Sequence, residues 1–361
     1  AHCISQWGQE FRPDYLNAGR KVAGFSERFK MTKLIFSATI SEQVFDEISI
    51  LMPGIVTVEN SEKNYNPVRD HIKMDFMHNV VEDDRLVEIA NYLKSGNFNP
   101  VLSRAIIFVK SRRKVDECAL LMSDCLKDVF GSDCSFSEKV GAFHAAMDAE
   151  DREDTYDKFY SGEIVILFAT KAFGMGIDKP DVRFVIHHDI PKSLEGYYQE
   201  TGRAGRDGGE GNCVTFYSYD DIMKLEKFMK DKPVNEQEIG KQMLSETASF
   251  AETSSCRRKF ILHYFGEEFN EVKCNEMCDN CRHPKQKFEA QDDLLLAIKA
   301  VKETKEKHKV KDIINVLMGN LTATGKSYKH NELKTWGEGV DHDKDDKFWN
   351  AVLRQALVYG Y

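Results

Sequence analysis

The chain of 361 residues has no uninterrupted apolar run of about 18 residues, so no membrane-spanning helix or membrane partner is expected. Proline is scarce, at 8 residues, and 42% of the residues are hydrophobic, which excludes a collagen and a wholly disordered chain. The nine cysteines are an odd number without even spacing. Reduced thiols, some of them metal ligands, therefore fit better than a secreted disulfide scaffold. The net charge of −9 argues against a uniformly basic binder, but not against a local basic groove.

The length and the first residue indicate several domains and a longer parent chain. At roughly 100–200 residues per domain, the chain is expected to form two to four packed units. It has no signal peptide and begins with Ala1 rather than Met, so we expect it to be part of a longer protein. Residues 1–66 are expected to hold only a strand at 33–36, a helix and a strand at 55–58. We predict that this segment is the end of a domain that starts earlier.

Short apolar runs alternate with amphipathic helical patterns between residues 67 and 218. The predicted strands are 105–109, 140–143, 164–169, 184–187 and 213–217, and the clearest helices are 111–130 and 149–160. Apolar strands separated by helices imply a parallel sheet that is covered on both faces. The pattern predicts one complete α/β domain.

From residue 219 the pattern becomes helical. Helices are predicted at 220–230, 235–251 and 257–265, and three short helices are predicted beyond residue 290. The segment 299–334 carries nine lysines against four acids, a local charge of +5. A basic face supplies phosphate contacts without base specificity, although solvated helix faces would carry the same lysines. The acidic cluster at 341–346 is not expected to face phosphate.

Four cysteines follow the spacing C-x17-C-x3-C-x2-C; they are Cys256, Cys274, Cys278 and Cys281. Four thiolates close a tetrahedral zinc site of the structural kind, with no open position for water. Reduced buried cysteines or an iron–sulfur cluster are the alternatives. His283 is expected to be a bystander, and the other cysteines are expected to be isolated thiols. We predict a Zn2+ site that supports folding rather than catalysis.

Two arginines lie three residues apart in a glycine-rich segment, Gln199–Gly208, which is preceded by a second glycine-rich segment at 173–178. Glycine lets backbone approach a ligand closely, and arginine forks match phosphate oxygens. An arginine that reaches a γ-phosphate across a cleft stabilises charge in phosphoryl transfer. On spacing alone, a glycine-rich surface turn with two solvated arginines is an equal alternative.

The set and order of these motifs resemble the RecQ family of superfamily 2 DNA helicases. Residues 1–8 are similar to the end of the DEAH motif II, 37–39 to motif III, 107–112 to motif IV, 169–178 to motif V and 199–208 to motif VI. The resemblance implies RecA-like parallel-sheet lobes that hold ATP and Mg2+ between them. It divides the chain into the end of lobe one (1–66), lobe two (67–218), a helical zinc-binding subdomain (219–285) and a truncated winged-helix domain (286–361).

The resemblance also implies roles around the nucleotide. Arg206 would be the arginine finger, Arg203 a second phosphate or coupling contact, and Gln199 a link between nucleotide state and lobe closure. His2 would lie beside the metal and water site. Coupling would involve Ser37, Thr39, Asp178, Gly202 and Gly205. For His2, Ser37 and Thr39, a strand-end or capping role stays open.

DNA contacts are expected from two places. The aromatic-rich loop contributes Trp7, Phe11 and Arg12, whose stacking on an unpaired base is worth about 1–3 kcal/mol. Burial of these aromatics to pin the loop is the alternative reading, and Gln9 stands where the family suggests histidine. The track on the second lobe is expected at Ser111, Arg112, His144 and Thr170.

The phosphate-binding loop is absent from this sequence. The one Gly-Lys-Ser run, Gly325–Ser327, has Asn320 where a phosphate loop needs its first glycine. The resemblance implies an ATP-dependent 3′-to-5′ DNA helicase of recombination, repair and replication, and we expect this piece alone to lack ATPase activity. A non-catalytic DNA-binding scaffold and a DEAD-box RNA helicase are the alternatives. Expected partners are single-stranded and duplex DNA, single-strand-binding protein and recombination factors, in the cytoplasm of a bacterium or the nucleus of a eukaryote.

Overall fold

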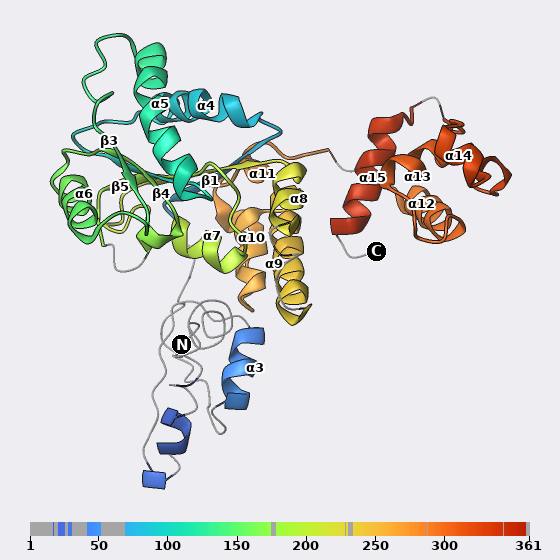
Figure 1. Cartoon of the computed structure of the whole chain (residues 1–361), viewed down its shortest axis with the longest axis horizontal. Coiled ribbons are helices and arrows are strands. Elements are labelled where there is room, and N and C mark those ends of the chain that lie inside the picture. The colour runs from blue at the N-terminus through green and yellow to red at the C-terminus, as the bar shows by residue number, and fades with distance from the viewer. Residues whose placement is uncertain are drawn as a thin grey trace. The chain divides into compact units, whose positions relative to one another are not determined.

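Two compact units, Ala1–Pro284 and Lys285–Tyr361, make up the chain in this computed structural model (Figure 1). The structure describes residues 17, 21–25, 28–30, 42–51, 69–174, 178–227, 229, 234–286, 288–341 and 343–358. Helix α3 (Glu42–Leu51) belongs to the N-terminal part. The strands predicted at 33–36 and 55–58 lie outside the described residues. None of the helices that the structure describes is long and apolar enough to cross a bilayer.

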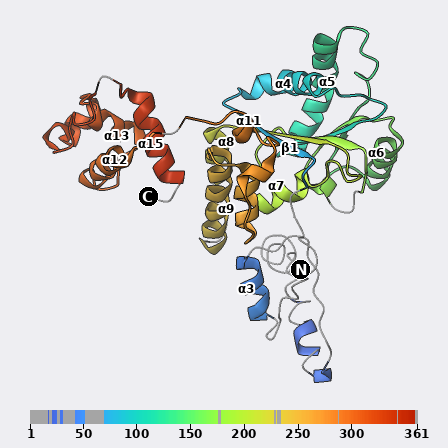
Figure 2. The same ribbon diagram turned by 180° about the vertical axis from the view of Figure 1, so that it is seen from behind.

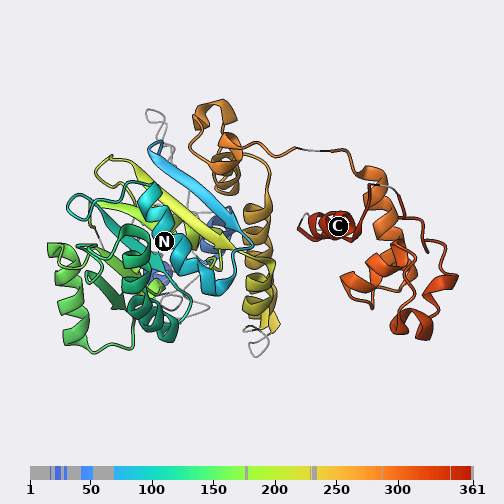
Figure 3. The same ribbon diagram turned by 90° about the horizontal axis from the view of Figure 1, so that it is seen from above.

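A six-stranded, all-parallel sheet forms the centre of the first unit, in the order β1-β6-β5-β2-β4-β3. The strands are β1 (Ile72–His78), β2 (Arg104–Phe108), β3 (Val140–Phe143), β4 (Ile166–Ala169), β5 (Val182–His187) and β6 (Gly211–Tyr217). Five of them confirm the sequence prediction. The prediction missed β1, which lies side by side with β6 at the sheet edge (Figure 3). Its polar residues Lys73 and Asp75 alternate with buried Ile72, Met74 and Phe76, so it lacks a continuous apolar run.

Helices cover both faces of this sheet (Figure 1). On one face lie α4 (Arg85–Ser95) and α5 (Arg112–Phe130), which share a buried cluster with Ala105 and Ile107 of β2. The next residues along the strand, Ile106 and Phe108, belong to the cluster on the other face. This alternation follows from the two-residue period of a strand. The structure confirms the predicted α/β fold with a doubly covered parallel sheet.

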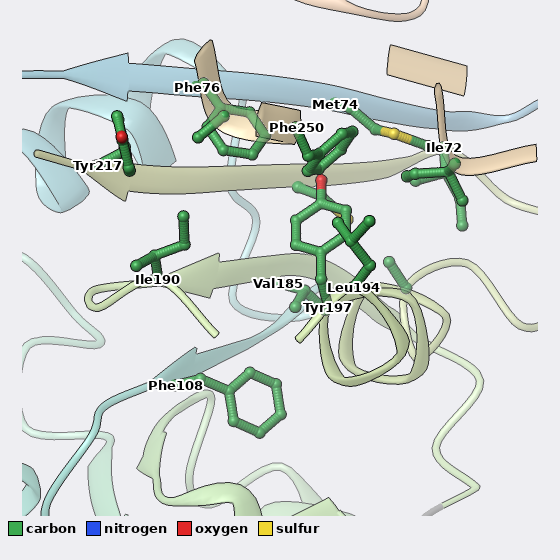
Figure 4. Close-up of a cluster of buried hydrophobic side chains, with 14 of the residues drawn as sticks. Ile72, Met74, Phe76, Phe108, Val185, Ile190, Leu194, Tyr197, Tyr217 and Phe250 are labelled. Carbon is green, nitrogen blue, oxygen red and sulfur yellow. The ribbon is translucent and has the colours of Figure 1, made fainter. Parts of the chain in front are cut away.

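The second face carries the helices that matter for the candidate site. They are α6 (Ala149–Ser161), α7 (Leu194–Thr201), α8 (Tyr219–Lys227), α9 (Val234–Glu252) and α10 (Arg257–Tyr264), of which α9 and α10 lie side by side (Figure 2). Figure 4 shows Phe250 of α9 against Phe76 and Tyr197, with ring centroids 5.3 and 5.0 Å apart. The cysteine-rich segment therefore shares the core of the sheet. It continues through short helix α11 (Asp279–Arg282).

The second unit has its own apolar cluster. Its described helices are α12 (Gln291–Glu303), α13 (Val310–Leu317), α14 (Ala323–Ser327) and α15 (Asp346–Val358), so the prediction of three was wrong. The five-residue α14 is too short to show a helical period in the sequence. Trp349 is fully buried, and its Nε1 donates to the carbonyl of Gly339 at 2.9 Å. Short 3-10 turns complete the described structure at Glu82–Asp84, Lys171–Gly174, Glu271–Cys274 and His330–Glu332.

Candidate functional site

The turn after α7 carries both arginines of the glycine-rich segment; we call residues 202–209 the arginine turn. Helix α7 begins at the N-cap Ser193, whose hydroxyl accepts a hydrogen bond from the Gly196 amide at 3.2 Å. Gly205 has φ +58°, and a Cβ there would lie 2.3 Å from the Gly209 carbonyl oxygen. Only glycine fits this backbone without strain. The turn therefore has a specific backbone conformation that depends on glycine at position 205.

Arg206 lies beside a residue of the preceding glycine-rich segment. Its Nη1 donates to Asp178 Oδ1 at 2.9 Å, and the two side chains are 31% and 84% exposed. The structure thus brings together two of the predicted site residues. An ion pair this exposed is worth little, because water and salt screen it. Arg206 can therefore exchange Asp178 for another anion at small cost.

Arg203 has a different environment. Its side chain is buried, and burial together with the charge of Arg206 lowers its pKa to about 10. It lines a pocket of about 280 Å³ together with Gln199 and Thr170, two further predicted site residues. A buried cation at a pocket wall is stabilised by an anion brought next to it. The pocket is suited to an anionic ligand.

A buried hydrogen-bond chain fixes the helix that leads into the arginine turn. His187 Nε2 donates to Glu200 Oε2 at 2.8 Å, and His187 Nδ1 accepts from the Thr215 hydroxyl at 3.3 Å. The carboxylate and the hydroxyl together set the tautomer of this ring. Sequence reasoning missed both His187 and Glu200. The signal was faint: Glu200 adjoins Gln199, and His187 ends a predicted strand.

The predicted DNA-contacting residues follow strand ends. His144 comes directly after β3, Thr170 directly after β4, and Ser111 and Arg112 follow β2 by a few residues. These strands are neighbours in the sheet, so the residues lie along one edge, where open α/β sheets bind ligands. The Thr170 amide donates to the carbonyl of Phe143 at 3.2 Å. Because they lie along one edge, these residues could contact the same ligand.

Two of these residues also have structural contacts. Ser111 is the N-cap of α5, and its hydroxyl accepts from the Lys114 amide at 3.4 Å. His144 Nε2 lies 3.1 Å from both carboxylate oxygens of Asp116. Arg112 is exposed. The remaining predicted site residues lie outside the described residues; they are His2, Trp7, Phe11, Arg12, Ser37 and Thr39.

The four spaced cysteines converge. Their Sγ atoms all lie within 4.8 Å of one another, and all but Cys281 are buried. A tetrahedron with Zn–S bonds of about 2.3 Å has sulfur–sulfur edges of about 3.8 Å, so the cluster fits zinc. Hydrogen bonds from Cys256 and Cys274 lower the pKa of the Cys278 thiol well below its usual range. His283 is not part of this cluster.

Backbone and side-chain contacts hold the metal ligands in place. Cys256 is the N-cap of α10, and the next residue, Arg257, is fully buried. Arg257 donates to both carboxylate oxygens of Asp279, at 2.5 and 2.9 Å, and its guanidinium lies 3.8 Å from the centre of the Phe76 ring. Asp279 stands between two of the cysteines in sequence. The loop that carries Cys278 and Cys281 is therefore tied to the helix that carries Cys256.

The Gly-Lys-Ser run is part of a helix. Gly325 lies inside α14, and its amide donates to the hydroxyl of the N-cap Thr322 at 3.1 Å. A phosphate loop would instead join a strand to a helix N-terminus. No named strand lies in the described part of 285–361. Gly325–Ser327 is a helical turn.

The fold, the arginine turn and the sulfur cluster define a class of protein, and family comparisons narrow it. Residues 88–208 match the model described as helicase conserved C-terminal domain, which places the sheet among RecA-like helicase lobes. Residues 219–282 match the model for RecQ zinc-binding, and residues 284–361 match the RQC domain. The chain belongs to the RecQ family of helicases.

Curated relatives agree with this assignment. The chain is 32% identical to the ATP-dependent DNA helicase RecQ of Haemophilus influenzae, over 100% of this chain and 54% of that protein. It is 33% identical to the ATP-dependent DNA helicase hus2/rqh1 of Schizosaccharomyces pombe, over 90% of this chain and 23% of the relative. The chain is also 33% identical to the ATP-dependent DNA helicase Q1 of Pongo abelii, over 89% of this chain and 47% of that protein. The chain thus spans about half, or less, of the length of these relatives.

Proposed function

We propose that this chain is part of an ATP-dependent DNA helicase of the RecQ type that moves 3′ to 5′ along single-stranded DNA. The observation that carries the proposal is the arginine turn, where Arg206 is paired only weakly with Asp178. Family membership and the names of the relatives support DNA as the substrate. ATP and Mg2+ would occupy a site between this lobe and another.

The arginine turn would act on the nucleotide through charge. Arg206 would leave Asp178 for the γ-phosphate and stabilise the charge that spreads over it during transfer. Arg203 and Gln199, which share a pocket, would respond to the nucleotide and pass its state to the rest of the lobe. His187 of β5 would hold the C-terminal end of α7 in place through its hydrogen bond to Glu200. Gly205, with φ +58°, allows the backbone to make this turn, and Gly202 ends α7 in a helical conformation.

The phosphate-binding loop would lie outside these 361 residues. The sequence has no second Gly-Lys-Ser or Gly-Lys-Thr run, and Gly325–Ser327 is part of helix α14. His2, Ser37 and Thr39 would contribute from the first lobe. We expect the 361 residues alone to have no ATPase activity.

DNA would follow the strand-end edge of the lobe. Ser111, Arg112, His144 and Thr170 would contact phosphates there, and Trp7, Phe11 and Arg12 would stack on bases. The lysine-rich segment 299–334 would hold duplex DNA. Such an enzyme would act in recombination, repair and replication, in the nucleoid of a bacterium or the nucleus of a eukaryote. Single-strand-binding protein and recombination factors would be its partners.

Zinc would have a structural role. The four thiolates of Cys256, Cys274, Cys278 and Cys281, which lie close together, would complete a tetrahedral ligand set and leave no position for a reacting water. Bound zinc would supply cross-links between α10 and the loop at 274–281. The chain's own residues Arg257 and Asp279 align these two segments.

The test compares ATP hydrolysis by the full-length protein and its Arg206→Ala variant, with and without single-stranded DNA. We expect the variant to lose about 10³–10⁵-fold in kcat, as arginine fingers do, with unchanged DNA affinity. Arg152→Ala on α6, which removes an arginine far from the turn in sequence, should keep normal turnover. Normal turnover in Arg206→Ala would contradict the assignment of the finger.

Duplexes with single-stranded tails test the direction and the substrate. We expect unwinding of a DNA duplex with a 3′ tail and none with a 5′ tail. Preferential unwinding of an RNA duplex would instead support an RNA helicase. A full-length protein that binds DNA without hydrolysing ATP would support a scaffold.

A further inference from the structure

Arg69, three residues before β1 in sequence, reaches the arginine turn across more than 130 positions of sequence. Its Nη1 donates to the carbonyl of Ala204 at 3.1 Å, and its Nη2 donates to the carbonyl of Gly202. These two carbonyls belong to the residues on either side of Arg203. One guanidinium therefore holds the carbonyls of the residues before and after a proposed nucleotide contact.

His71 completes this contact. Its Nε2 donates to the carbonyl of Gly205 at 2.8 Å, directly before Arg206 in the chain. The Gly205 amide donates to the Val182 carbonyl of β5 at 2.8 Å. Carbonyls at a helix C-terminus lack partners within the helix and attract cations. The segment 69–71 thus donates hydrogen bonds to three carbonyls of the arginine turn and fixes the backbone positions of Arg203 and Arg206.

The segment 69–71 is also held by hydrogen bonds from the zinc-binding part. Nη2 of Arg258 donates to the carbonyls of Arg69, Asp70 and Ile72 at 3.3, 2.8 and 2.9 Å. Its Nη1 donates to the Asp70 carboxylate at 3.2 Å, and its side chain is 1% exposed. Arg258 stands two residues after the zinc ligand Cys256, in the first turn of α10.

A second contact joins β1 to the metal loop. The Met74 amide donates to the carbonyl of Met277 at 2.9 Å, next to Cys278. The Phe76 amide donates to Asp279 Oδ2 at 3.2 Å. Residues 69–71 and β1 thus contact the cysteine-bearing segments as well as the arginine turn.

We propose that Arg69 is a positioning residue for the arginine turn, and that Arg258 makes the geometry of this turn depend on bound zinc. This proposal rests on the proposed ATPase function and deepens it. Zinc fixes Cys256 at the start of α10, and α10 fixes the Arg258 guanidinium. That guanidinium orients the peptide groups of 69–72, and Arg69 then orients those around Arg203. Zinc would thus support turnover as well as folding.

The first experiment compares Arg69→Ala and Arg69→Lys in the full-length protein. We expect Arg69→Ala to lower kcat for ATP by about 10–100-fold, because a misplacement of about 1 Å can cost about 10² in rate. DNA affinity, zinc content and the unfolding midpoint should stay close to wild type. Lysine supplies one point charge instead of a fork, so Arg69→Lys should recover only part of kcat.

Arg282→Ala is the matched control. Arg282 also joins the zinc-binding part to β1, through the Asp75 carboxylate, but it makes no hydrogen bond or ion pair with residues 69–72. Its loss should leave kcat within about twofold of wild type. If Arg282→Ala and Arg69→Ala lower kcat equally, the effect is general loosening, and the proposal for Arg69 is overturned. Wild-type kcat in Arg69→Ala would overturn it as well.

The second experiment needs no ATPase activity. Amide hydrogen exchange at residues 202–208 is measured in the zinc-loaded wild type, in Arg69→Ala and in Arg258→Lys. We expect exchange at least about tenfold faster in both variants, with unchanged exchange in α4 and α5. Unchanged protection of 202–208 would contradict the proposal. If the wild type has no ATPase activity, the proposed function fails, while this measurement still decides whether Arg69 holds the turn.

Discussion

The zinc-binding segment 219–282 and the unit Lys285–Tyr361 are held together in different ways. The first shares a buried cluster with the sheet and adds four converging sulfurs. The second packs an apolar cluster of its own around Trp349. The zinc-binding segment is thus anchored to the sheet both by apolar packing and by the buried Arg258, which donates to the Ile72 carbonyl of β1. The second unit is stabilised by its own apolar core.

Removal of zinc should have the largest effect and should separate the two regions. Structural zinc contributes about 10–16 kcal/mol of apparent binding free energy in small zinc domains. We expect chelation, or Cys278→Ser, to unfold 256–282 and to leave Lys285–Tyr361 protected. Segment-resolved hydrogen exchange with and without chelator measures this. Protection of 256–282 that survives chelation would mean that packing against the sheet suffices there.

Trp349→Ala should give the opposite pattern. The side chain is fully buried and donates one hydrogen bond, so its loss should cost about 3–5 kcal/mol within the second unit. Zinc content and exchange at 256–282 should be unchanged. Urea unfolding combined with metal analysis measures both. Loss of zinc in this variant would show that the two regions are not independent.

Acid should weaken the second unit and the helicase lobe in different pH ranges. Burial and the charge of His308 lower the pKa of His330 below its ordinary 6.5, so its folded form binds fewer protons. Its share of stability is complete above pH 6.5 and is lost as pH falls below that value. The slope is at most about 1.4 kcal/mol per pH unit for one group. Exchange measured in α13 and α14 between pH 7.5 and 5 should show it, and His330→Gln should remove it.

The helicase lobe should keep its stability to a lower pH than the second unit. Burial tends to raise the pKa of Asp189, but the hydrogen bond from His188 and the charges of His188 and Lys110 outweigh it and hold the pKa well below 3.8. Its stabilising share is present above pH 3.8 and is lost as pH falls through the lowered pKa. Protection of β5 should therefore fall only below about pH 4. Asp189→Asn should reduce this dependence, and equal losses of protection in the second unit and in the helicase lobe at pH 5 would contradict the prediction.

The smallest effects should come from two helix caps within the lobe. Ser193→Ala removes the 3.2 Å cap of α7 and should cost about 1 kcal/mol. Ser111→Ala removes the longer 3.4 Å cap of α5 and should cost less. Thermal unfolding compares them. If Ser111 also contacts DNA, only its variant should lose affinity for single-stranded DNA; equal affinity in both would leave Ser111 as a cap alone.

Local patterns predicted most of the sheet because its central strands are continuous apolar runs. Edge strand β1 was missed because Lys73 and Asp75 interrupt it. The cysteine spacing predicted the ligand set, since metal chemistry restricts which side chains can serve. No local pattern pointed to Arg69 or Arg258 as contacts of distant carbonyls. Their partners lie far away in sequence and meet them only after β1 has paired with β6.

The sequence alone determined the helicase family, the parallel sheet and the identity of the four cysteines that converge, because period, glycine spacing and thiol chemistry are local properties. The tertiary structure decided that Arg206 meets Asp178 and that Arg203 lines a pocket. It also decided that the zinc-binding helix holds the segment that carries Arg69. These contacts join residues far apart in the chain, and only the packing of strands and helices sets their distances.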